Sequence, residues 1–593
     1  MFKKNRRHFQ IPLTSNVEEL PEKLRKHLDT SWSGVFYREV FCRLDEAPFA
    51  VLYADCPSRP NIPVNVLVGL EYLKAGNGWS DEEMLEEYGY NSQVRYALGY
   101  RQLGEGDFDE RTLYYFRERL SRYMQETGIN LLDQAFEQVT DRQIAAFHLK
   151  TGKQRMDSTQ VASNIRSMGR LQLLVEVLQR VYRMLSEEDQ GRYAEGFAPF
   201  IQGHAGQYVY HLKGQDTSEH LQKIGELMVH LLSELQPGYA QEPVYQVLER
   251  VFGEHFRVEE KVLKAKNDQE LSASSLQSPD DLEATYRQKG QKSYQGYVAN
   301  LTETCDPEND LQLVTKVQVA SNHTEDAELL VEAIPGLKER TKLDVLYTDG
   351  GYGSPAADRT LQEKKVEQIQ TAIRGRIPGT EKLNLSDFKI KQAESGKPTR
   401  ITCPQGQTVE VHSSSQRESR ADQGSLSNNS AGKKGFVAHF EAEVCQACPF
   451  LQKCPAQRGK RDPRFHLRFD QKQVHMSQRR QRSLIHREEG RNLRAAIEAT
   501  VRSVKHPFPA GKLPVRGRFR VTCMVIGSAL VSNVRRIQSY LEAKSKLENE
   551  QKKAQTGQPC SQAQPSVSFF ASLKLIFHGW IELVSPQRMG FGD

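Results

Sequence analysis

Three acidic residues that lie far apart in the chain could together hold divalent metal ions. Asp349 ends the apolar run of "KLDVLYTDGGYGSP", Asp157 lies in "RMDSTQV", where we expect a strand to end, and Glu498 lies in the helical pattern "RNLRAAIEATVRSVK". Carboxylate oxygens are ligands that Mg²⁺ prefers. Two Mg²⁺ ions about 3.5–4 Å apart can stabilise both the attacking and the leaving oxygen of an in-line phosphoryl displacement. The acids therefore predict a two-metal site for phosphoryl transfer.

Each acid also has a simpler interpretation. Asp-Gly and Gly-Gly pairs are common turn signals, and an aspartate before Ser-Thr is typical of a turn or a cap. Glu498 could form ion pairs with Arg494 and Arg502, which lie four residues before and after it on a helix. Glu488 and Glu489 lie about three helical turns earlier and are alternative candidates for the third metal ligand.

The segment around Glu498 separates into two faces when it is wound as a helix. The apolar face carries Leu493, Ala496, Ile497, Thr500, Val501 and Val504. On the opposite face Glu498 is surrounded by four bases, which are Arg491, Arg494, Arg502 and Lys505. Such bases can contact phosphate groups beside the acids.

A cysteine cluster is the second group of candidate metal ligands. Cys445, Cys448 and Cys454 lie in "VCQACPFLQKCP", and Cys403 lies upstream. Cys-x2-Cys is the usual spacing for two thiolate ligands of a tetrahedral Zn²⁺. The segment is polar and has few core-forming residues, and such a segment gains most from a bound metal. We expect either a structural zinc site or free thiols here.

The candidate acids must be positioned by a mixed α/β region in the centre of the chain. After about residue 147 the pattern predicts a strand with Asp157 and then long helices to about residue 285. Residues 294–321 read as a hairpin of two strands, 326–341 as a helix, and 366–373 as a strand that follows the one ending at Asp349.

Changes in composition and in hydrophobic pattern divide the chain into five parts. We expect a helical N-terminal domain at 1–145, the first part of the core at 146–380 with a helical insertion at about 168–285, a cysteine-containing insertion at 381–480, the return of the core with the third acid at 481–540, and a tail at 541–593. Ser80 and Glu83 form a capping-box pattern in the first part. Residues 412–435 read as a polar loop and 541–567 as a solvated linker.

Positive charge is concentrated in one segment. The net charge is +6, but residues 451–520 hold 19 Lys and Arg against 5 Asp and Glu, which gives +14 there and −8 in the remainder. This clustering is typical of proteins that bind a polyanion such as nucleic acid, although a solvated basic face would show the same pattern.

The sequence carries no signal for a membrane or for export. It has no run of 18 uncharged apolar residues, and no long apolar segment follows the basic start "MFKKNRRHFQIPL". The nine cysteines without an export signal favour reduced thiols or a metal site over disulfides. These features predict a cytoplasmic protein without a membrane partner.

The order Asp157, Asp349, Glu498 resembles the DDE catalytic triad of bacterial insertion-sequence transposases with an RNase H-like core. In one large branch the glutamate lies in a Tyr-x2-Arg-x3-Glu-x6-Lys signature. The chain matches it at Arg494, Glu498 and Lys505 and has Arg491 in place of the tyrosine. "YTDGGYGSP", "RPNIPVNVLVGLEYLK" and "DFDERTLYYFRERL" also resemble segments of these transposases. The resemblance covers about residues 30–540 and is closest to the insertion-sequence group numbered eleven eighty-two.

The resemblance implies an α/β fold with an RNase H-like mixed sheet and an enzyme that cuts DNA at element ends and joins the freed 3′-hydroxyl to target DNA. Two Mg²⁺ ions held by the three acids would be its cofactors, and the four bases of the third-acid segment would contact DNA. The implied partners are double-stranded DNA, as terminal inverted repeats and as target, and further copies of the chain in a homodimer or larger assembly.

Two other functions share these residues. A DDE-type nuclease would use the same triad without joining strands. A catalytically inactive, transposase-derived regulator would only bind DNA, and it could lose all three acids without harm to binding. The intact triad therefore argues against a regulator.

Overall fold

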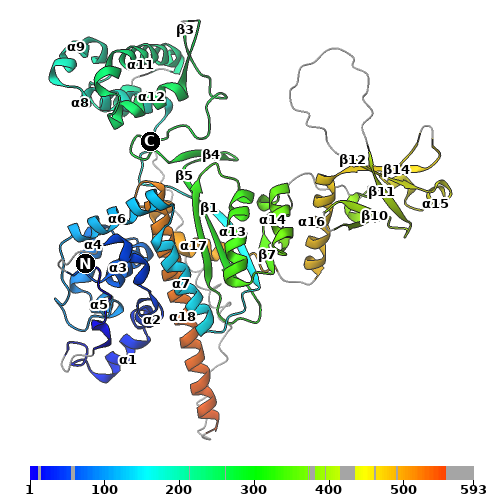
Figure 1. Ribbon diagram of the computed structural model, residues 1–593, viewed down its shortest axis with the longest axis horizontal. Helices are drawn as coiled ribbons and strands as arrows, with labels where there is room; N and C mark the ends of the chain where they lie inside the picture. The colour runs from blue at the N-terminus through cyan, green and yellow to red at the C-terminus, as the bar shows by residue number, and fades with distance from the viewer. Residues whose placement is uncertain are drawn as a thin grey trace, which may run out of the picture. The chain divides into compact units, whose positions relative to one another are not determined.

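The computed structural model describes most of the chain (Figure 1). The described residues are 1–10, 15–54, 60–210, 212, 214–260, 262–371, 373, 381–393, 396–414, 435–459, 462–488 and 492–555. The chain divides into two compact units, Met1–Gln538 and Ser539–Asp593, and all three candidate acids lie in the first. None of the helices in the described ranges combines the length and the apolar character that crossing a bilayer requires.

The N-terminal region is helical, as its apolar spacing predicts. Its helices are α1 (Glu22–Thr30), α2 (Trp32–Glu39), α3 (Val64–Asn77), α4 (Asp81–Tyr90), α5 (Ser92–Ala97), α6 (Arg111–Thr127) and α7 (Leu131–Ala146). Helix α3 is apolar on nearly all sides and is buried along most of its length. The predicted capping box is present at the start of α4, where Ser80 Oγ accepts from the Glu83 amide at 3.1 Å and Glu83 Oε2 accepts from the Ser80 amide at 2.7 Å.

A mixed sheet forms the centre of the molecule. Its strands are β1 (Lys153–Val161), β4 (Thr285–Lys289), β5 (Lys292–Thr304), β6 (Val314–Ser321), β7 (Val345–Thr348) and β8 (Glu367–Gln370). Strand β5 pairs antiparallel with β1, β4 and β6, and β7 pairs parallel with both β1 and β8. The predicted hairpin is therefore β5 and β6. The fold class, a mixed α/β structure, agrees with the sequence pattern.

One face of this sheet is covered by two helices. Helices α13 (Asp326–Thr341) and α14 (Pro355–Glu363) bury apolar side chains against Met156 of β1 and Leu346 of β7. Successive side chains of a strand point to opposite faces. Arg155 and Asp157 therefore point away from this core, toward the face on which α17 (Ile497–Lys505) packs against β1.

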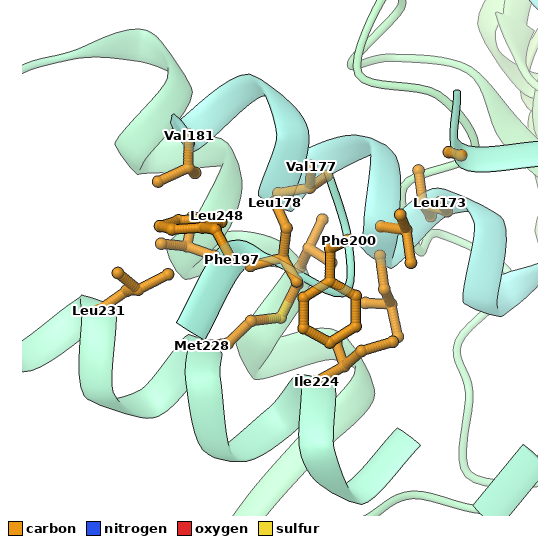
Figure 2. Close-up of a cluster of buried hydrophobic side chains, with 14 of the residues drawn as sticks. Leu173, Val177, Leu178, Val181, Phe197, Phe200, Ile224, Met228, Leu231 and Leu248 are labelled. Atoms are coloured by element: carbon orange, nitrogen blue, oxygen red, sulfur yellow. The ribbon is translucent and has the colours of Figure 1, made fainter. Parts of the chain in front are cut away.

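The segment between β1 and β4 is a helical body with its own core. Its helices are α8 (Arg170–Met184), α9 (Glu187–Phe197), α10 (Ala205–Tyr210), α11 (Thr217–Tyr239) and α12 (Pro243–His255). Figure 2 shows Leu178, Phe200, Ile224 and Met228 converging between these helices. The helical prediction fails at the end of the segment, where β2 (Phe256–Glu259) and β3 (Val262–Ala265) form a hairpin. The hairpin includes two β-branched residues, Val258 and Val262, and the aromatic Phe256, which suit strands.

The cysteine-containing insertion is a second sheet with an apolar core. Its strands are β9 (Lys389–Gln392), β10 (Pro398–Thr402), β11 (Thr408–Ser414), β12 (Gly435–Phe440), β13 (Gln457–Arg458) and β14 (Phe465–Asp470), in the order β13-β14-β12-β11-β10-β9. Its core holds Phe388, Ile401, Phe436, Phe440 and Phe469. The expectation of a segment short of core-forming residues is therefore wrong. The aromatic residues alternate with polar ones, which lowers the mean hydropathy while one face remains apolar. Of the predicted polar loop, His412–Ser414 belongs to β11 and 415–434 lie outside the described residues.

Three helices follow the second sheet in the part of the chain that the structure describes. Helix α16 (Gln471–Glu488) follows β14, α17 carries Glu498, and α18 runs from Arg518 to Gln555. The predicted solvated linker is therefore helical over 541–555, because the helical pattern of α18 continues through its Lys- and Glu-rich end. The remaining predicted tail, 556–593, lies outside the described residues.

Candidate active site

Asp157 and Asp349 lie side by side at one edge of the central sheet. Strands β1 and β7 run parallel, and their last paired residues are Arg155 and Tyr347. Each aspartate follows its last paired residue by two positions, so both extend equally far beyond the β1–β7 ladder. The prediction that β1 ends near Asp157 is wrong, because β1 continues to Val161 through its pairing with β5.

Asp349 is fixed by the turn that follows β7. Its Oδ1 accepts a hydrogen bond of 2.7 Å from the Gly351 amide at the start of a short 3₁₀ turn, Gly350–Tyr352. The turn interpretation of Asp-Gly-Gly is therefore correct locally, and Asp349 caps the turn. The other carboxylate oxygen has no hydrogen-bond partner among the described residues and remains available to a ligand.

Asp157 lies in a partly dehydrated environment beside a second carboxylate. Burial is the main cause that raises its pKa, the charge of Asp349 raises it further, and Arg494 acts in the opposite direction. A nearby cation favours the ionised form of a carboxylate whose pKa is raised in this way. This electrostatic arrangement fits a divalent metal.

Glu498 reaches the same region from α17. Helix α17 buries Ile497, Thr500 and Val504, whereas the Glu498 side chain is 57% exposed. The guanidinium of Arg494 lies between the first and third acids, with Nη2 3.1 Å from Asp157 Oδ2 and Nη1 4.0 Å from Glu498 Oε1. The positive charge of Arg494 thus occupies a position between two of the candidate metal ligands.

Helix α17 begins later than its sequence pattern predicts. Residues 493–496 form turns instead of helix, and the helix starts at Ile497. Arg155 Nη1 donates a hydrogen bond of 2.7 Å to the Leu493 carbonyl, which ties this turn to β1. The Leu493 side chain packs beside Tyr347. Tertiary contacts with the sheet therefore take Leu493 and Ala496 out of the expected helical face.

A buried ion network that the sequence did not reveal anchors α17. Glu303 of β5 has a fully buried side chain that accepts from Arg155 Nε at 2.5 Å, Thr500 Oγ1 at 2.6 Å and Arg536 Nη1 at 2.7 Å. These contacts join β1, β5, α17 and α18 around one carboxylate. The signal that could have shown it is a glutamate inside the buried strand segment "VANLTET".

The four basic residues of the third-acid segment have different surroundings. Lys505 Nζ donates 2.9 Å to the Gln160 carbonyl, and burial lowers its pKa. Arg502 is exposed, and Arg494 pairs with Asp157. Arg491 lies outside the described residues.

The alternative third ligands lie at the end of α16. Glu488 is the last residue of that helix, and Glu489 lies outside the described residues. Helix α16 is held to α14 by the ion pair of Arg479 with Asp358, at 2.5 Å. Of these three glutamates, Glu498 is the one whose side chain the structure describes. Arg494 forms ion pairs with both Glu498 and Asp157 and so links them.

The four cysteines of the candidate zinc site line one small cavity. Cys403, Cys445, Cys448 and Cys454 surround a space of about 30 Å³ together with apolar side chains. Burial, followed by the three neighbouring thiols, raises the pKa of Cys445 to about 11. The Phe450 amide donates to Cys448 Sγ at 3.4 Å. The donor set and its convergence fit zinc, which would bind the deprotonated thiolates.

The sulfur atoms of these cysteines lie farther apart than the ligand atoms of a second group in the same insertion. Among the described residues, the group of three or more metal-binding side chains whose ligand atoms all lie within 4.8 Å of one another is His439, Asp462 and His466. A zinc ion bound at about 2.3 Å from each sulfur would therefore have to draw the cysteines closer.

One cavity among the described residues lies away from the acids. It measures about 910 Å³ and is lined by α3, α6 and the start of α18, with Lys74, Asp81 and Arg117 among its polar residues. None of the three acids lines it. A site for a long polymer on an open sheet edge need not be a deep cavity.

Two family models match parts of the chain. Residues 402–538 match a model described as transposase DDE domain, and residues 23–119 match one described as transposase domain (DUF772). The first range includes Glu498 and the four cysteines, and the second includes α1 to α5 and part of α6; Asp157 and Asp349 lie in neither. No curated protein and no solved structure matches the chain. The two matches support an insertion-sequence transposase.

Proposed function

We propose that this protein is a DDE transposase that cuts DNA at the ends of a mobile element and transfers the freed 3′-hydroxyl into target DNA. The observation that carries the proposal is the meeting of Asp157, Asp349 and the α17 segment at one sheet edge, with Arg494 between Asp157 and Glu498. The two transposase matches support the same function from different parts of the chain.

The core is RNase H-like in this proposal. Three antiparallel strands, β6, β5 and β1, continue into the parallel strands β7 and β8, with the acids where β1 and β7 part. The helical body between β1 and β4 and the cysteine-containing sheet are then insertions into this core. The N-terminal helices of residues 1–145 recognise the terminal inverted repeats, and residues 146–380 with 481–540 form the catalytic part. On the signature residues, we infer membership of the insertion-sequence group numbered eleven eighty-two.

Asp157, Asp349 and Glu498 would hold two Mg²⁺ ions, which supply charge stabilisation for the attacking and leaving oxygens of the phosphoryl transfer. The residues of this chain set the geometry. The Gly351 amide orients the Asp349 carboxylate. The buried Glu303 network fixes α17 against β1. Arg494 neutralises Asp157 before metal and DNA arrive and, with Arg491, Arg502 and Lys505, then contacts the DNA backbone.

The partners in this proposal are double-stranded DNA and further copies of the chain. The segment at 451–520 carries a net charge of +14 and supplies the attraction for two DNA molecules, the element end and the target. Pairing of two element ends would bring two copies together in a homodimer or larger assembly.

A strand-transfer assay tests the function. Oligonucleotides taken from the DNA that flanks the gene are incubated with the full chain, Mg²⁺ and a target plasmid. A transposase yields both cut ends and joined products, whereas a DDE nuclease yields cut ends alone. A regulator binds the ends and yields neither product. Joined products that persist in the Asp349→Asn variant would contradict the assignment of the acids.

A further inference from the structure

The outer face of the cysteine-containing sheet presents a pair of histidines directly opposite each other. In β12, "GFVAHF", and β14, "FHLRFD", the aromatic residues point into the core, so His439 and His466 point to the other face. The two are partners in the antiparallel ladder. Their rings meet edge to face with centroids 4.6 Å apart. Side chains in this position can share one ligand.

Asp462 completes the group from the turn that precedes β14. One ligand atom from each of His439, Asp462 and His466 lies within 4.8 Å of the others, and His466 Nε2 is 3.7 Å from Asp462 Oδ2. A side chain at Gly459 would crowd this place, because its Cβ would lie 2.6 Å from His466 Nε2 and 2.4 Å from the Asp462 carbonyl oxygen. The absence of a side chain there leaves the imidazole nitrogen open to a ligand.

The two imidazoles carry nitrogens without partners. His439 Nδ1 and His466 Nε2 are both buried and have no hydrogen-bond partner among the described residues. Buried polar atoms are normally hydrogen-bonded, and each exception calls for an explanation. A ring-to-ring contact alone leaves both nitrogens unsatisfied, whereas a cation placed between them satisfies both.

Arg464 is the present partner of Asp462. Its Nη2 and Nε lie 2.7 Å and 2.9 Å from Asp462 Oδ2. The Arg464 side chain is 46% exposed, so it can move away from the carboxylate without leaving a buried charge. Asp462 Oδ1 accepts from the Arg464 amide at 3.0 Å, which holds the carboxylate at the turn when the guanidinium moves.

We propose that His439, Asp462 and His466 bind a divalent transition-metal ion, with Zn²⁺ as the cation that fits best. Two imidazoles and one carboxylate form a ligand set that zinc accepts, with a fourth position open to water or a partner group. Imidazole ligands favour zinc and its neighbours over Mg²⁺. The site lies on the face opposite the apolar core against which Cys445 and Cys454 pack, so it is distinct from the cysteine cluster. It rests on no assumption about catalysis.

Cobalt substitution of the full chain tests the site. Co²⁺ bound to cysteines gives thiolate charge-transfer absorption, whereas Co²⁺ bound to imidazole and carboxylate gives only the weaker visible bands. In the Cys448→Ser variant, whose thiolate site is impaired, we expect one equivalent of Co²⁺ to bind with visible bands alone. Zn²⁺ should displace it.

The matched variants distinguish Co²⁺ binding at this site from nonspecific Co²⁺ binding. Adding His439→Ala and His466→Ala to Cys448→Ser should weaken Co²⁺ binding at least tenfold. Adding Arg468→Ala, an exposed neighbour of His466 on β14, should leave it unchanged. If the histidine variant does not fold, His466→Gln with a circular-dichroism check replaces it. Equal Co²⁺ binding in the histidine and Arg468 variants, or no visible bands in Cys448→Ser, would overturn the proposal.

Discussion

At the scale of single residues, the candidate active site is a balance of charges around Asp157. Its carboxylate is partly buried beside Asp349, and the guanidinium of Arg494 offsets the negative charge. An arginine between two carboxylates can hold them in place when no metal is bound. It cannot polarise a phosphate group as a metal ion in the same position does. In the proposed function, the arginine would preserve the geometry of the site until the metal and DNA bind.

The three acids should be individually essential for DNA cleavage. Asp157→Asn, Asp349→Asn and Glu498→Gln keep the shape of each side chain but weaken it as a ligand of Mg²⁺. Each variant should lose several kcal/mol of transition-state stabilisation, so end cleavage should fall about a thousandfold or more. DNA binding, measured separately by gel shift, should remain.

Glu488→Gln and Glu489→Gln are the matched controls for the third acid. They change the same functional group at the last residue of α16 and at the residue that follows it in the chain, and they should cut DNA at nearly the rate of the unmodified chain. Cleavage by Glu498→Gln at that rate, together with its loss in either control, would move the third ligand from α17 to the end of α16.

At the scale of elements, the position of α17 depends on the buried carboxylate of Glu303. Arg155, Thr500 and Arg536 all donate to it, so four elements converge on one charge. Breaking a buried ion pair by removing one partner leaves the other charge uncompensated and costs about 3–5 kcal/mol. The network therefore ties the placement of Glu498 to the integrity of β5.

Glu303→Gln should loosen α17 and reduce cleavage although residue 303 does not touch the acids. The variant leaves Arg155 and Arg536 without their shared counter-charge, so backbone amides of α17 should exchange hydrogen faster. Glu308→Gln, which removes a carboxylate from an exposed pair with Lys150, is the control and should have little effect. Hydrogen-exchange mass spectrometry measures both. Unchanged exchange in α17 of Glu303→Gln would contradict the anchoring role.

The loops that carry the four cysteines should depend on zinc for their local stability. Cys448→Ser should lose one equivalent of zinc relative to the unmodified chain and make the loops around β10 and α15 (Ala442–Gln446) sensitive to protease, because they lose their common ligand. The paired strands β12 and β14 should stay folded on their own apolar core. Cys42→Ser, at an exposed cysteine of the N-terminal region, is the control and should retain the metal. Metal analysis of freshly reduced protein measures the zinc. The same zinc content in both variants would mean that the four thiols are free.

At the scale of the whole molecule, binding to DNA should be governed by the basic segment at 451–520. Each phosphate that the protein neutralises releases condensed counterions, so affinity should fall steeply as salt rises. Arg494→Ala with Lys505→Ala should flatten the slope by up to about two contacts, and Arg502→Ala by about one. Arg183→Ala, at an exposed residue of α8 in the helical body between β1 and β4, is the control. Fluorescence anisotropy without Mg²⁺ measures the slopes. An unchanged slope in the first two variants would show that the segment with Arg494, Arg502 and Lys505 does not face DNA.

Local signals in the sequence determined the elements of this protein. The capping box of Ser80, the apolar run before Asp349 and the hairpin of β5 and β6 depend on neighbouring residues, whose patterns can be seen directly. The prediction was wrong where distant contacts override such patterns. Leu493 leaves the helical face because Arg155 binds its carbonyl. Residues 541–555 are a different case, because there the local helical pattern of α18 continues into the predicted linker.

The sequence by itself determined the order of the acids, the cysteine spacing and the segment that carries the positive charge. Only the tertiary structure decided that Asp157 and Asp349 extend equally far from neighbouring parallel strands. It also decided that Glu303 forms ion pairs with Arg155 and Arg536, and that His439 lies opposite His466. The physical reason is that each of these arrangements depends on strand register or on packing between residues distant in the chain. A shift of one residue in register would turn these side chains to the other face of the sheet, and local spacing carries no record of that choice.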